Sequence, residues 1–325
     1  MNAKIVGLGK YLPEKILTNQ ELEKMVETSN EWILKRVGIR ERRISDENTY
    51  TSDLAVRAAE AALKDAGMKP EELDLILVAS VTPDMYTPSV ACLVQKGLGA
   101  VNAVAFDVNA ACTGFVFAMV TAHQYIKSGM YKNALVIGAD ALSKVTEYQD
   151  RKTCVLFGDG AGAAVLQATE EETGILMSKM GSDGASGDCL TLPGIRCDAE
   201  DAERRPFGNH RTIWMDGSAV FKFAVRVMAA SAREVVEQAG KTLDDVRLMI
   251  PHQANMRIID AAAKRLQMGD DRVFVNVDKY GNMSSACIPI ALCEAVEEGR
   301  AKQGDLVVLV GMGGGLTWGS TLIEL

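Results

Sequence analysis

The chain has 325 residues, of which 48% are hydrophobic and 24% charged, and its net charge is −8. This length allows two domain-sized units or one large duplicated fold, and the negative charge argues against a general nucleic-acid binder while leaving room for a local basic patch. No apolar run is long enough to cross a bilayer, and the N-terminus meets Gly, Lys and Pro too soon for a signal-peptide core, so we expect a cytoplasmic protein with no membrane partner.

The seven cysteines predict neither a disulfide framework nor a metal site. Their number is odd, no pair has C-x-x-C spacing, and the chain has only three histidines. Zinc sites need clustered Cys and His ligands, and disulfide frameworks belong to small secreted chains. We therefore expect no metal, mostly buried thiols, and one cysteine that could be reactive.

An internal repeat organises the chain. The segment 58–80, an amphipathic helix followed by an acidic turn and a buried strand, resembles the segment 231–253. The spacing from Gly67 to Gly240 defines the repeat offset, and the same offset pairs three further landmarks in order: Asn109 with Asn282, Cys112 with Ser285, and Gly138 with Gly311. A single offset that fits so many landmarks indicates duplication.

The repeat predicts an α/β fold with two duplicated halves, residues 1–172 and 173–325. Short continuous apolar runs such as "LDLILVAS" and "ALVIGAD" are typical of strands covered on both faces, and helices alternate with them. Two unrelated α/β domains with a common order of elements are the alternative. In a duplicated fold the turns after equivalent strands face each other, so these turns are candidates for one shared site.

The first such turn, in chain order, carries Cys112 in "DVNAACTGF", at the start of an apolar helix. Free N–H groups and the partial positive charge of a helix N-terminus stabilise a thiolate and lower the thiol pKa, which favours a nucleophile. A buried structural thiol is the alternative for a cysteine considered alone. His123 lies within the same helix and is assigned no chemistry, and His210 is expected in a surface loop.

The second half supplies three further candidates. His252 follows the strand in "LMIPHQANMRIID", where an imidazole can reach a cleft, although a lone histidine is more often a cap or a core residue. Asn282, in "DKYGNMSSACIP", is either a helix cap or a neutral amide donor. Three consecutive glycines in "VVLVGMGGGLTWGS" allow a close backbone approach, and a backbone N–H there could join that of Cys112 in an oxyanion hole. Together these groups suit chemistry on thioesters.

These motifs resemble the thiolase superfamily and, within it, the β-ketoacyl-acyl-carrier-protein synthase III family. The resemblance covers essentially the whole chain and rests on "ACTGF", "PHQANMRI", "YGNMSSA" and "GGGLTWGS", in this order and spacing. It implies a five-layered αβαβα thiolase fold, a homodimer and no cofactor. It also implies a reaction: an acyl-CoA primer acylates a cysteine, and malonyl-acyl-carrier protein then loses carbon dioxide and attacks, giving a 3-oxoacyl-carrier protein that initiates fatty-acid synthesis.

The resemblance assigns roles to the candidate residues. It implies that Cys112 is the nucleophile, that His252 and Asn282 hold the malonyl thioester oxygen, and that the N–H groups of Cys112 and Gly314 form the oxyanion hole. The residues it implies for CoA binding are Trp32 and Arg151 at the adenine, Arg36 at a phosphate, and Gly217 and Asn255 at the pantetheine arm. The alternative is that the helix bearing Trp32 merely packs against the core and that its basic run is solvated.

The carrier protein is acidic, so its docking patch should be basic. Arg257 and Lys264 are seven residues apart on one predicted helix and therefore share a face. The family pattern implies a docking patch of Lys222, Gln253, Arg257, Lys264 and Arg265. Ordinary surface charges are the alternative explanation for the basic residues among them.

Two positions depart from the family pattern. Thr87 and Met312 stand where many relatives carry phenylalanine at the acyl pocket. Because threonine is much smaller than phenylalanine, we expect a deeper pocket and primers larger than acetyl.

Other enzymes share the expected fold. A biosynthetic thiolase needs a second cysteine in the glycine loop, elongating synthases use two histidines, hydroxymethylglutaryl-CoA synthase needs a glutamate base, and plant-type polyketide synthases are longer. The nearest alternative is a synthase III homologue of a specialised pathway that makes a polyketide or quinolone starter. A non-catalytic scaffold that only binds carrier protein is the alternative from another class.

Overall fold

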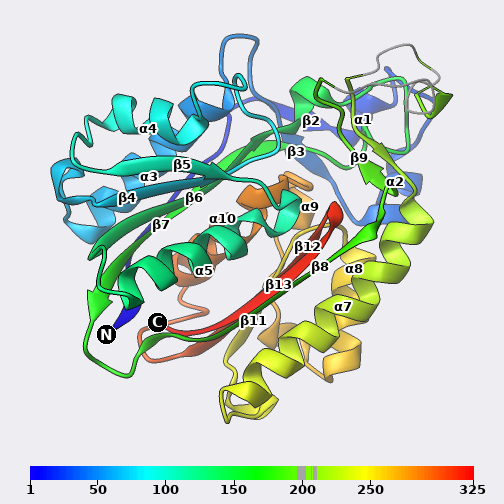
Figure 1. Cartoon of the computed structure of the whole chain (residues 1–325). Coiled ribbons are helices and arrows are strands. Elements are labelled where there is room, and N and C mark those ends of the chain that lie inside the picture. Colours follow the sequence, from blue (N-terminus) through cyan, green and yellow to red (C-terminus); the bar gives the residue numbers. More distant parts are fainter. Residues whose placement is uncertain (196–202, 206, 208–210) are drawn as a thin grey trace.

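Two β-sheets form the frame of the computed structural model, which describes residues 1–195, 203–205, 207 and 211–325 (Figure 1). The first sheet has the order β1-β7-β6-β4-β5 and the second β11-β12-β13-β8. The strands of the first are β1 (Asn2–Tyr11), β4 (Leu75–Ala79), β5 (Val104–Val108), β6 (Asn133–Ala141) and β7 (Asp159–Thr169). Those of the second are β8 (Gly174–Gly187), β11 (Leu248–Pro251), β12 (Leu306–Gly313) and β13 (Gly315–Glu324).

Helices cover both faces of each sheet and give five layers, as Figure 1 shows. Apolar side chains of α3 and α4 pack on the outer face of the first sheet, α5 and α10 fill the space between the sheets, and α7 and α8 cover the outer face of the second. The helices are α3 (Thr51–Ala66), α4 (Val90–Leu98), α5 (Gly114–Lys127), α7 (Gly217–Gln238), α8 (Met256–Leu266) and α10 (Cys287–Glu297). The expected α/β class and five-layered architecture are therefore confirmed.

The strands follow the predicted pattern of burial. Every residue of β4 and of β11 is buried, because helices cover both faces of the sheet at these positions. β4 pairs in parallel with β5 and β6, and β11 with β12, while the chain-reversing pairs β6–β7 and β12–β13 are antiparallel. Parallel neighbours place their carboxyl ends at one edge, so the turns after β4, β6, β11 and β12 gather there.

Elements recur along the chain at the repeat offset. β4 corresponds to β11, β6 to β12, and α5 to α10, and the first residues of each pair are separated by the same spacing as Gly67 and Gly240. Among the residues that the structure describes, the second sheet has no strand that corresponds to β5, and an isolated parallel bridge between Met249 and Val273 lies beside β11 instead.

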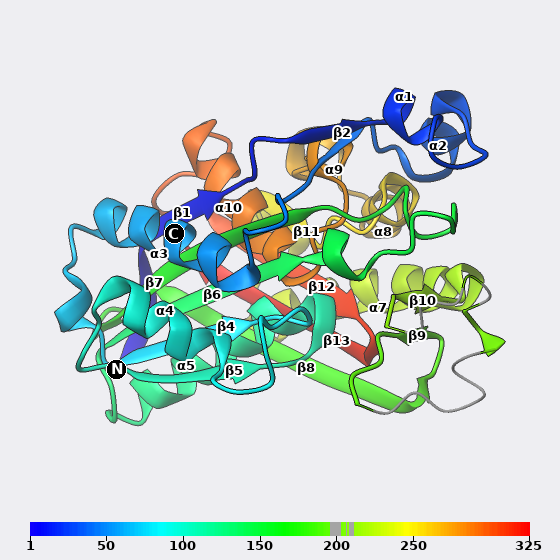
Figure 2. The same cartoon turned by 90° about the horizontal axis from the view of Figure 1, so that it is seen from above.

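Smaller elements lie at the end of the molecule opposite the N-terminus (Figure 2). One group consists of β2 (Ile16–Thr18), α1 (Asn19–Leu22), α2 (Asn30–Val37) and β3 (Glu41–Arg43), and the other is the ribbon of β9 (Leu190–Thr191) and β10 (Trp214–Met215). Gly38 ends α2 with a φ of 77°, and a Cβ there would lie 2.5 Å from the Cβ of Met256 at the start of α8. This close approach fixes α2 against α8.

Candidate active site

Cys112 lies in a constrained turn between β5 and α5. Ala111 has a φ of 48°, in the left-handed region that non-glycine residues rarely adopt, and a single 3-10 turn then leads into the helix. Thr113 donates a hydrogen bond from its hydroxyl to the carbonyl of Ala110 at 2.9 Å. Such strain is retained where the surrounding structure holds a side chain in one direction. The Cys112 side chain is aimed into a cavity and is 8% exposed.

The electrostatics of this thiol differ from the sequence-based prediction. Burial raises the pKa of Cys112 to about 12; the Ser284 hydroxyl beside it acts in the opposite direction, and the Asp140 carboxylate raises the pKa further. The prediction of a lowered pKa counted only the helix N-terminus. It was wrong for the free protein because removing the thiol from water disfavours the charged form by more than its neighbours stabilise it.

His252 follows β11 directly and is almost fully buried. Its backbone N–H donates to the carbonyl of Val310 on β12 at 2.7 Å, and its side chain is 1% exposed. Burial lowers the pKa of the imidazole to about 3, so the ring is neutral at physiological pH. Its Nδ1 is buried and has no hydrogen-bond partner among the described residues. A neutral imidazole carries one N–H, and this ring is free to offer it to a ligand.

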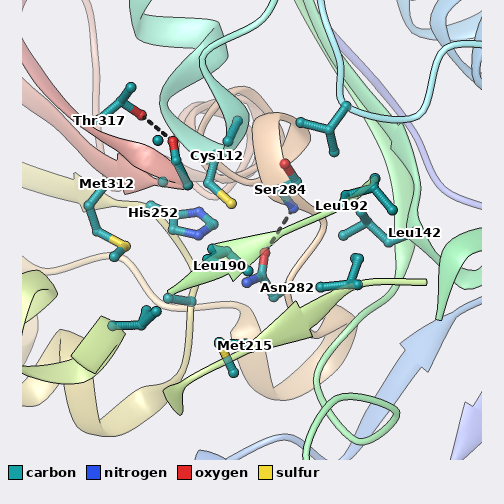
Figure 3. A pocket seen from close by; sticks show the side chains of 18 of the residues that line it. Cys112, Leu142, Leu190, Leu192, Met215, His252, Asn282, Ser284, Met312 and Thr317 are labelled. Carbon is teal, nitrogen blue, oxygen red and sulfur yellow. Dashed lines mark hydrogen bonds between the residues drawn. The ribbon is translucent and has the colours of Figure 1, made fainter. Parts of the chain in front are cut away.

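Asn282 is held by both its backbone and its side chain. Its N–H donates to the carbonyl of Leu156 at 2.8 Å, and its own carbonyl accepts from the N–H of Gly158 at 3.0 Å. The side-chain Oδ1 accepts from the N–H of Ser284 at 2.8 Å, which leaves the amide hydrogens as donors for another group. In Figure 3 the carboxamide, the His252 ring and the Cys112 sulfur point toward a common space.

The glycine loop where β12 ends and β13 begins, from Gly313 to Gly315, closes the other side of this space. A Cβ on Gly313 would lie 2.6 Å from the backbone nitrogen of Cys112, so only glycine allows this approach. Thr317, on β13, donates to the carbonyl of Ala110 at 2.9 Å and also contacts the hydroxyl of Thr113. The loop is therefore fastened to the turn that carries Cys112.

These residues line one cavity of about 350 Å³. Cys112, His252, Asn282, Met312 and Gly314 contribute to its wall, as does Asn255. Much of the remaining wall is apolar, and sequence reasoning did not identify it: Leu142, Leu190, Leu192, Ile213, Met215 and Val220. Several of these come from the irregular region around β9 and β10, which has no periodic pattern that would reveal its burial.

A second cavity of about 610 Å³ adjoins the first, and Leu156, Met215, Val220, Asn255 and Ile258 belong to the walls of both. The predicted residues Trp32, Arg36 and Gly217 line this second cavity. The Arg151 guanidinium lies over the Trp32 ring, 5.4 Å from its centroid. Sequence reasoning missed Lys152, Trp214 and Phe221, which also line it.

The predicted carrier-docking residues divide into two groups. Lys222, Arg257, Lys264 and Arg265 are exposed on α7 and α8, and Arg257 also lines the second cavity. Gln253 is 0% exposed, and all its side-chain hydrogen bonds are internal. The prediction of a docking role for Gln253 does not fit this burial, because a side chain inside the protein cannot reach a partner.

Three other expectations concern residues away from the cavity. Thr87 is exposed in the loop before α4 and does not line the cavity. Its expected place in the acyl pocket is therefore not supported by its position in this structure. His123 donates a hydrogen bond from Nε2 to Oδ1 of Asn2 at 2.7 Å and takes no part in the site. His210 lies outside the described residues.

The described part of the chain contains no group of three or more His, Cys, Asp or Glu side chains able to hold a metal ion. Within the same residues no helix is long and apolar enough to span a membrane.

The layered frame and the cavity between its turns place the chain among the thiolase-fold acyltransferases. Two family models match it: 3-oxoacyl-[acyl-carrier-protein (ACP)] synthase III over residues 106–184, and the C-terminal model of the same name over residues 236–325. A β-ketoacyl-[acyl-carrier-protein] synthase III from Caldanaerobacter subterraneus is 54% identical, with 99% of this chain and 97% of the relative covered. The chain belongs to the β-ketoacyl-[acyl-carrier-protein] synthase III family.

Solved structures agree with this assignment. The crystal structure of 3-oxoacyl-[acyl-carrier-protein] synthase III from Aquifex aeolicus has a TM-score of 0.93 and 49% identity, with 99% of this chain and 100% of that chain covered. The priming β-ketosynthase of the R1128 polyketide pathway is 33% identical, with a TM-score of 0.92 and coverage of 100% and 96%. The higher identity to synthase III proteins does not favour the specialised-pathway alternative.

Proposed function

We propose that the protein condenses an acyl-CoA primer with malonyl-acyl-carrier protein, the first condensation of fatty-acid synthesis, with Cys112, His252 and Asn282 as catalytic residues. One observation carries this proposal. A thiol, a neutral imidazole and the carboxamide of Asn282 line a single cavity, which shares a wall with a second cavity bearing an indole and basic side chains. A nucleotide-bearing thioester fits the second cavity, with its acyl group in the first.

In the first half-reaction Cys112 takes the acyl group. The sulfur attacks the thioester carbonyl, the bond from carbonyl carbon to CoA sulfur breaks, and the proton of the Cys112 thiol ends on the released CoA thiol. We assign the oxyanion hole to the backbone N–H groups of Cys112 and Gly314, because Gly313 allows the loop to approach the Cys112 nitrogen so closely. The adenine would stack on Trp32 beneath Arg151, with Arg36 at a phosphate and Gly217 and Asn255 beside the pantetheine arm.

In the second half-reaction His252 and Asn282 act as a pair of neutral donors. Loss of carbon dioxide from the malonyl group places negative charge on its thioester oxygen, and donors aimed there stabilise the transition state. Asn282 supplies its amide N–H, because its oxygen is already occupied by Ser284. Nδ1 of His252 is buried, so a substrate in the cavity cannot reach it. We therefore assign the donated hydrogen bond to Nε2. The enolate carbon then attacks the acyl group on Cys112, the bond from the acyl carbon to sulfur breaks, and the released thiolate takes up one proton from water.

The apolar wall of the first cavity receives the primer's acyl chain. Met312 and the leucines of the wall offer it a dry surface. The expected preference for primers larger than acetyl, which was based on Thr87, stays a prediction. It is tested by the ratio of acetyl to isobutyryl turnover, which Thr87→Phe should raise and which an uninvolved residue would leave unchanged.

We also propose that an acidic carrier protein docks on α7 and α8, at Lys222, Arg257, Lys264 and Arg265, which are all exposed.

We further propose that the chain consists of two halves, 1–172 and 173–325, that it forms a homodimer, and that it is located in the cytoplasm. The recurrence of elements at the repeat offset supports the two halves. Light scattering of the purified protein tests the dimer.

Intact-protein mass spectrometry tests the reaction. The protein is mixed with acyl-CoAs from acetyl to decanoyl, straight and branched, and peptide mapping then locates the adduct before malonyl-carrier protein is added. We expect one acyl group on Cys112 that disappears as 3-oxoacyl-carrier protein forms. The absence of any adduct on Cys112, or an adduct that persists after the malonyl substrate is added, would contradict the proposal.

A further inference from the structure

The side chain next to His252 is directed into the protein. Gln253 is completely buried, although it lies between the catalytic imidazole and the exposed helix α8. A buried carboxamide is costly unless all its polar atoms are paired. Its position and its partners therefore need an explanation other than contact with a carrier protein.

Every hydrogen-bonding position of the Gln253 carboxamide is filled. Nε2 donates to the carbonyl of Pro251 at 2.8 Å and to that of Phe274 at 3.2 Å. Oε1 accepts from the backbone N–H of Asn276 at 3.0 Å and from that of Val277 at 3.1 Å. Two donor hydrogens and two acceptor lone pairs are the full capacity of this group.

These partners belong to the two segments that carry the donor pair. Pro251 is the last residue of β11 and immediately precedes His252, while Val277 is the first residue of the short helix α9 (Val277–Tyr280) and Asn276 is its N-cap. Only one residue separates the end of α9 from Asn282. The Gln253 side chain therefore joins the start of the His252 turn to the start of the Asn282 segment.

The backbone alone does not make this connection. Within the described residues the second sheet ends at β11. The backbone pairing found beyond it there is the hydrogen bond from Phe274 to the carbonyl of Met249, at 2.9 Å, and the isolated bridge between Met249 and Val273. The Gln253 carboxamide continues this pairing by side-chain hydrogen bonds where a fifth strand is missing. Removing it would leave buried backbone groups of both segments unpaired.

Cys287 makes a second, weaker connection between the same two segments. Its sulfur lies 3.9 Å from the carbonyl oxygen of Gln253 and 3.8 Å from Oδ1 of Asn282, and it accepts from the N–H of Met283 at 3.1 Å. The thiol is completely buried, and burial raises its pKa, so it stays protonated and can donate to one of these oxygens.

We propose that Gln253 is a positioning residue that fixes His252 relative to Asn282, and that Cys287 supports it. The inference rests on the proposed role of His252 and Asn282 in decarboxylation. Two donors act on one developing oxyanion only if their separation is fixed, because small misplacements weaken the stabilisation of a transition state. Gln253 should therefore affect the malonyl half-reaction and leave the acylation of Cys112 intact.

The test compares two malonyl donors that share a thioester and a pantetheine arm. Decarboxylation of malonyl-carrier protein and of malonyl-CoA is measured for Gln253→Glu, Gln253→Met and Cys287→Ala, together with the rate of Cys112 acylation. For the Gln253 variants we expect kcat to fall at least tenfold with both donors, KM to change little, and acylation to stay within twofold of the original protein. Cys287→Ala should show the same pattern with a smaller loss.

Several results would overturn the inference. A loss of decarboxylation with malonyl-carrier protein but not with malonyl-CoA would indicate that Gln253 acts in docking. Lys264→Glu, at an exposed docking position, shows what a loss of docking looks like in this assay. Equal losses in acylation and decarboxylation would indicate general damage to the fold, and unchanged decarboxylation would remove any role. Gln253→Glu keeps the acceptor oxygen for α9, so it provides the test if Gln253→Met does not fold. If His252→Ala itself retains decarboxylation, the proposed function is wrong. If His252→Ala is inactive but the Gln253 variants decarboxylate at the normal rate, only this inference is wrong.

Discussion

The turns at Cys112 and Ser285 have the same backbone but different surroundings. Ala111 and Ser284, which precede them, have φ values of 48° and 50°, and each turn leads through a 3-10 segment into a helix between the sheets. Cys112 faces a cavity, whereas the Ser285 hydroxyl is buried and shares its one hydrogen between the Asp140 carboxylate and the carbonyl of Ala79, both at 2.7 Å. The repeat therefore reproduces the scaffold, and the side chains decide which turn is reactive.

A residue near the end of the neighbouring strand makes the difference. Asp140 lies in β6 and accepts the backbone N–H of Ser285 at 3.0 Å. The equivalent position in the second half, at the end of β12, is Gly313, which has no side chain to occupy the N–H of Cys112. One turn thus has its amide satisfied by a carboxylate, and the other presents its amide toward the glycine loop. We infer that this asymmetry provides the oxyanion hole.

The largest effect should follow from making the two turns chemically alike. Cys112→Ser replaces the thiol by a hydroxyl, which is a far weaker nucleophile without an adjacent base, and we expect acyl transfer from acyl-CoA to fall at least ~10³-fold. Stopped-flow release of CoA measures this rate. Retention of substantial acyl transfer by the serine variant would mean that another residue carries the acyl group.

A Cβ at position 313 should disturb the amide of Cys112. In Gly313→Ala the added atom would lie 2.6 Å from that nitrogen, so we expect acylation to slow by roughly 10²-fold, the cost of losing one oxyanion donor. Gly314→Ala is the matched variant, because its Cβ would meet no atom closer than 3.3 Å, and its effect should be smaller. The account fails if the two variants acylate at equal rates.

The pH dependence of alkylation distinguishes the effect of burial on the pKa of Cys112 from the effect of the helix N-terminus. The thiolate is the reactive form, and with a pKa of about 12 its fraction rises tenfold for each pH unit below that value. We therefore expect the rate of Cys112 alkylation by iodoacetamide to rise about 100-fold between pH 7 and pH 9. A rate that levels off near pH 8 would show that the helix N-terminus outweighs burial.

Ser285 should matter for stability rather than for chemistry. Ser285→Ala removes the buried hydroxyl hydrogen bond shared by Asp140 and Ala79 and should lower the free energy of unfolding by about 1–3 kcal/mol. Ser143→Ala is a matched control, because the Ser143 hydroxyl donates to the buried Asp159 at 2.6 Å and does not line the cavity. Both variants should unfold at lower denaturant concentration with normal activity per folded molecule. A selective loss of activity in Ser285→Ala would place this turn in the chemistry.

Much of the fold and the three central residues could be predicted from the sequence. The repeat offset and the apolar strands predicted the layers. Cys112 and His252 follow strands, Asn282 follows the short helix α9, and all three line one cavity. The direction of the Gln253 side chain could not be predicted, because its partners Phe274, Asn276 and Val277 lie far from it along the chain. The thiol pKa was missed for the same physical reason: the burial of Cys112 depends on the whole cavity wall, not on its own helix.

Separate measurement of the two half-reactions tests most directly whether Cys112 serves acyl transfer while His252 and Asn282 serve decarboxylation. Carbon dioxide release from malonyl-carrier protein and acyl transfer from acyl-CoA are followed in Cys112→Ala, His252→Ala and Asn282→Ala. The account predicts that Cys112→Ala still releases carbon dioxide but accepts no acyl group, and that His252→Ala and Asn282→Ala accept the acyl group but release little carbon dioxide. Loss of both half-reactions in all three variants would contradict it.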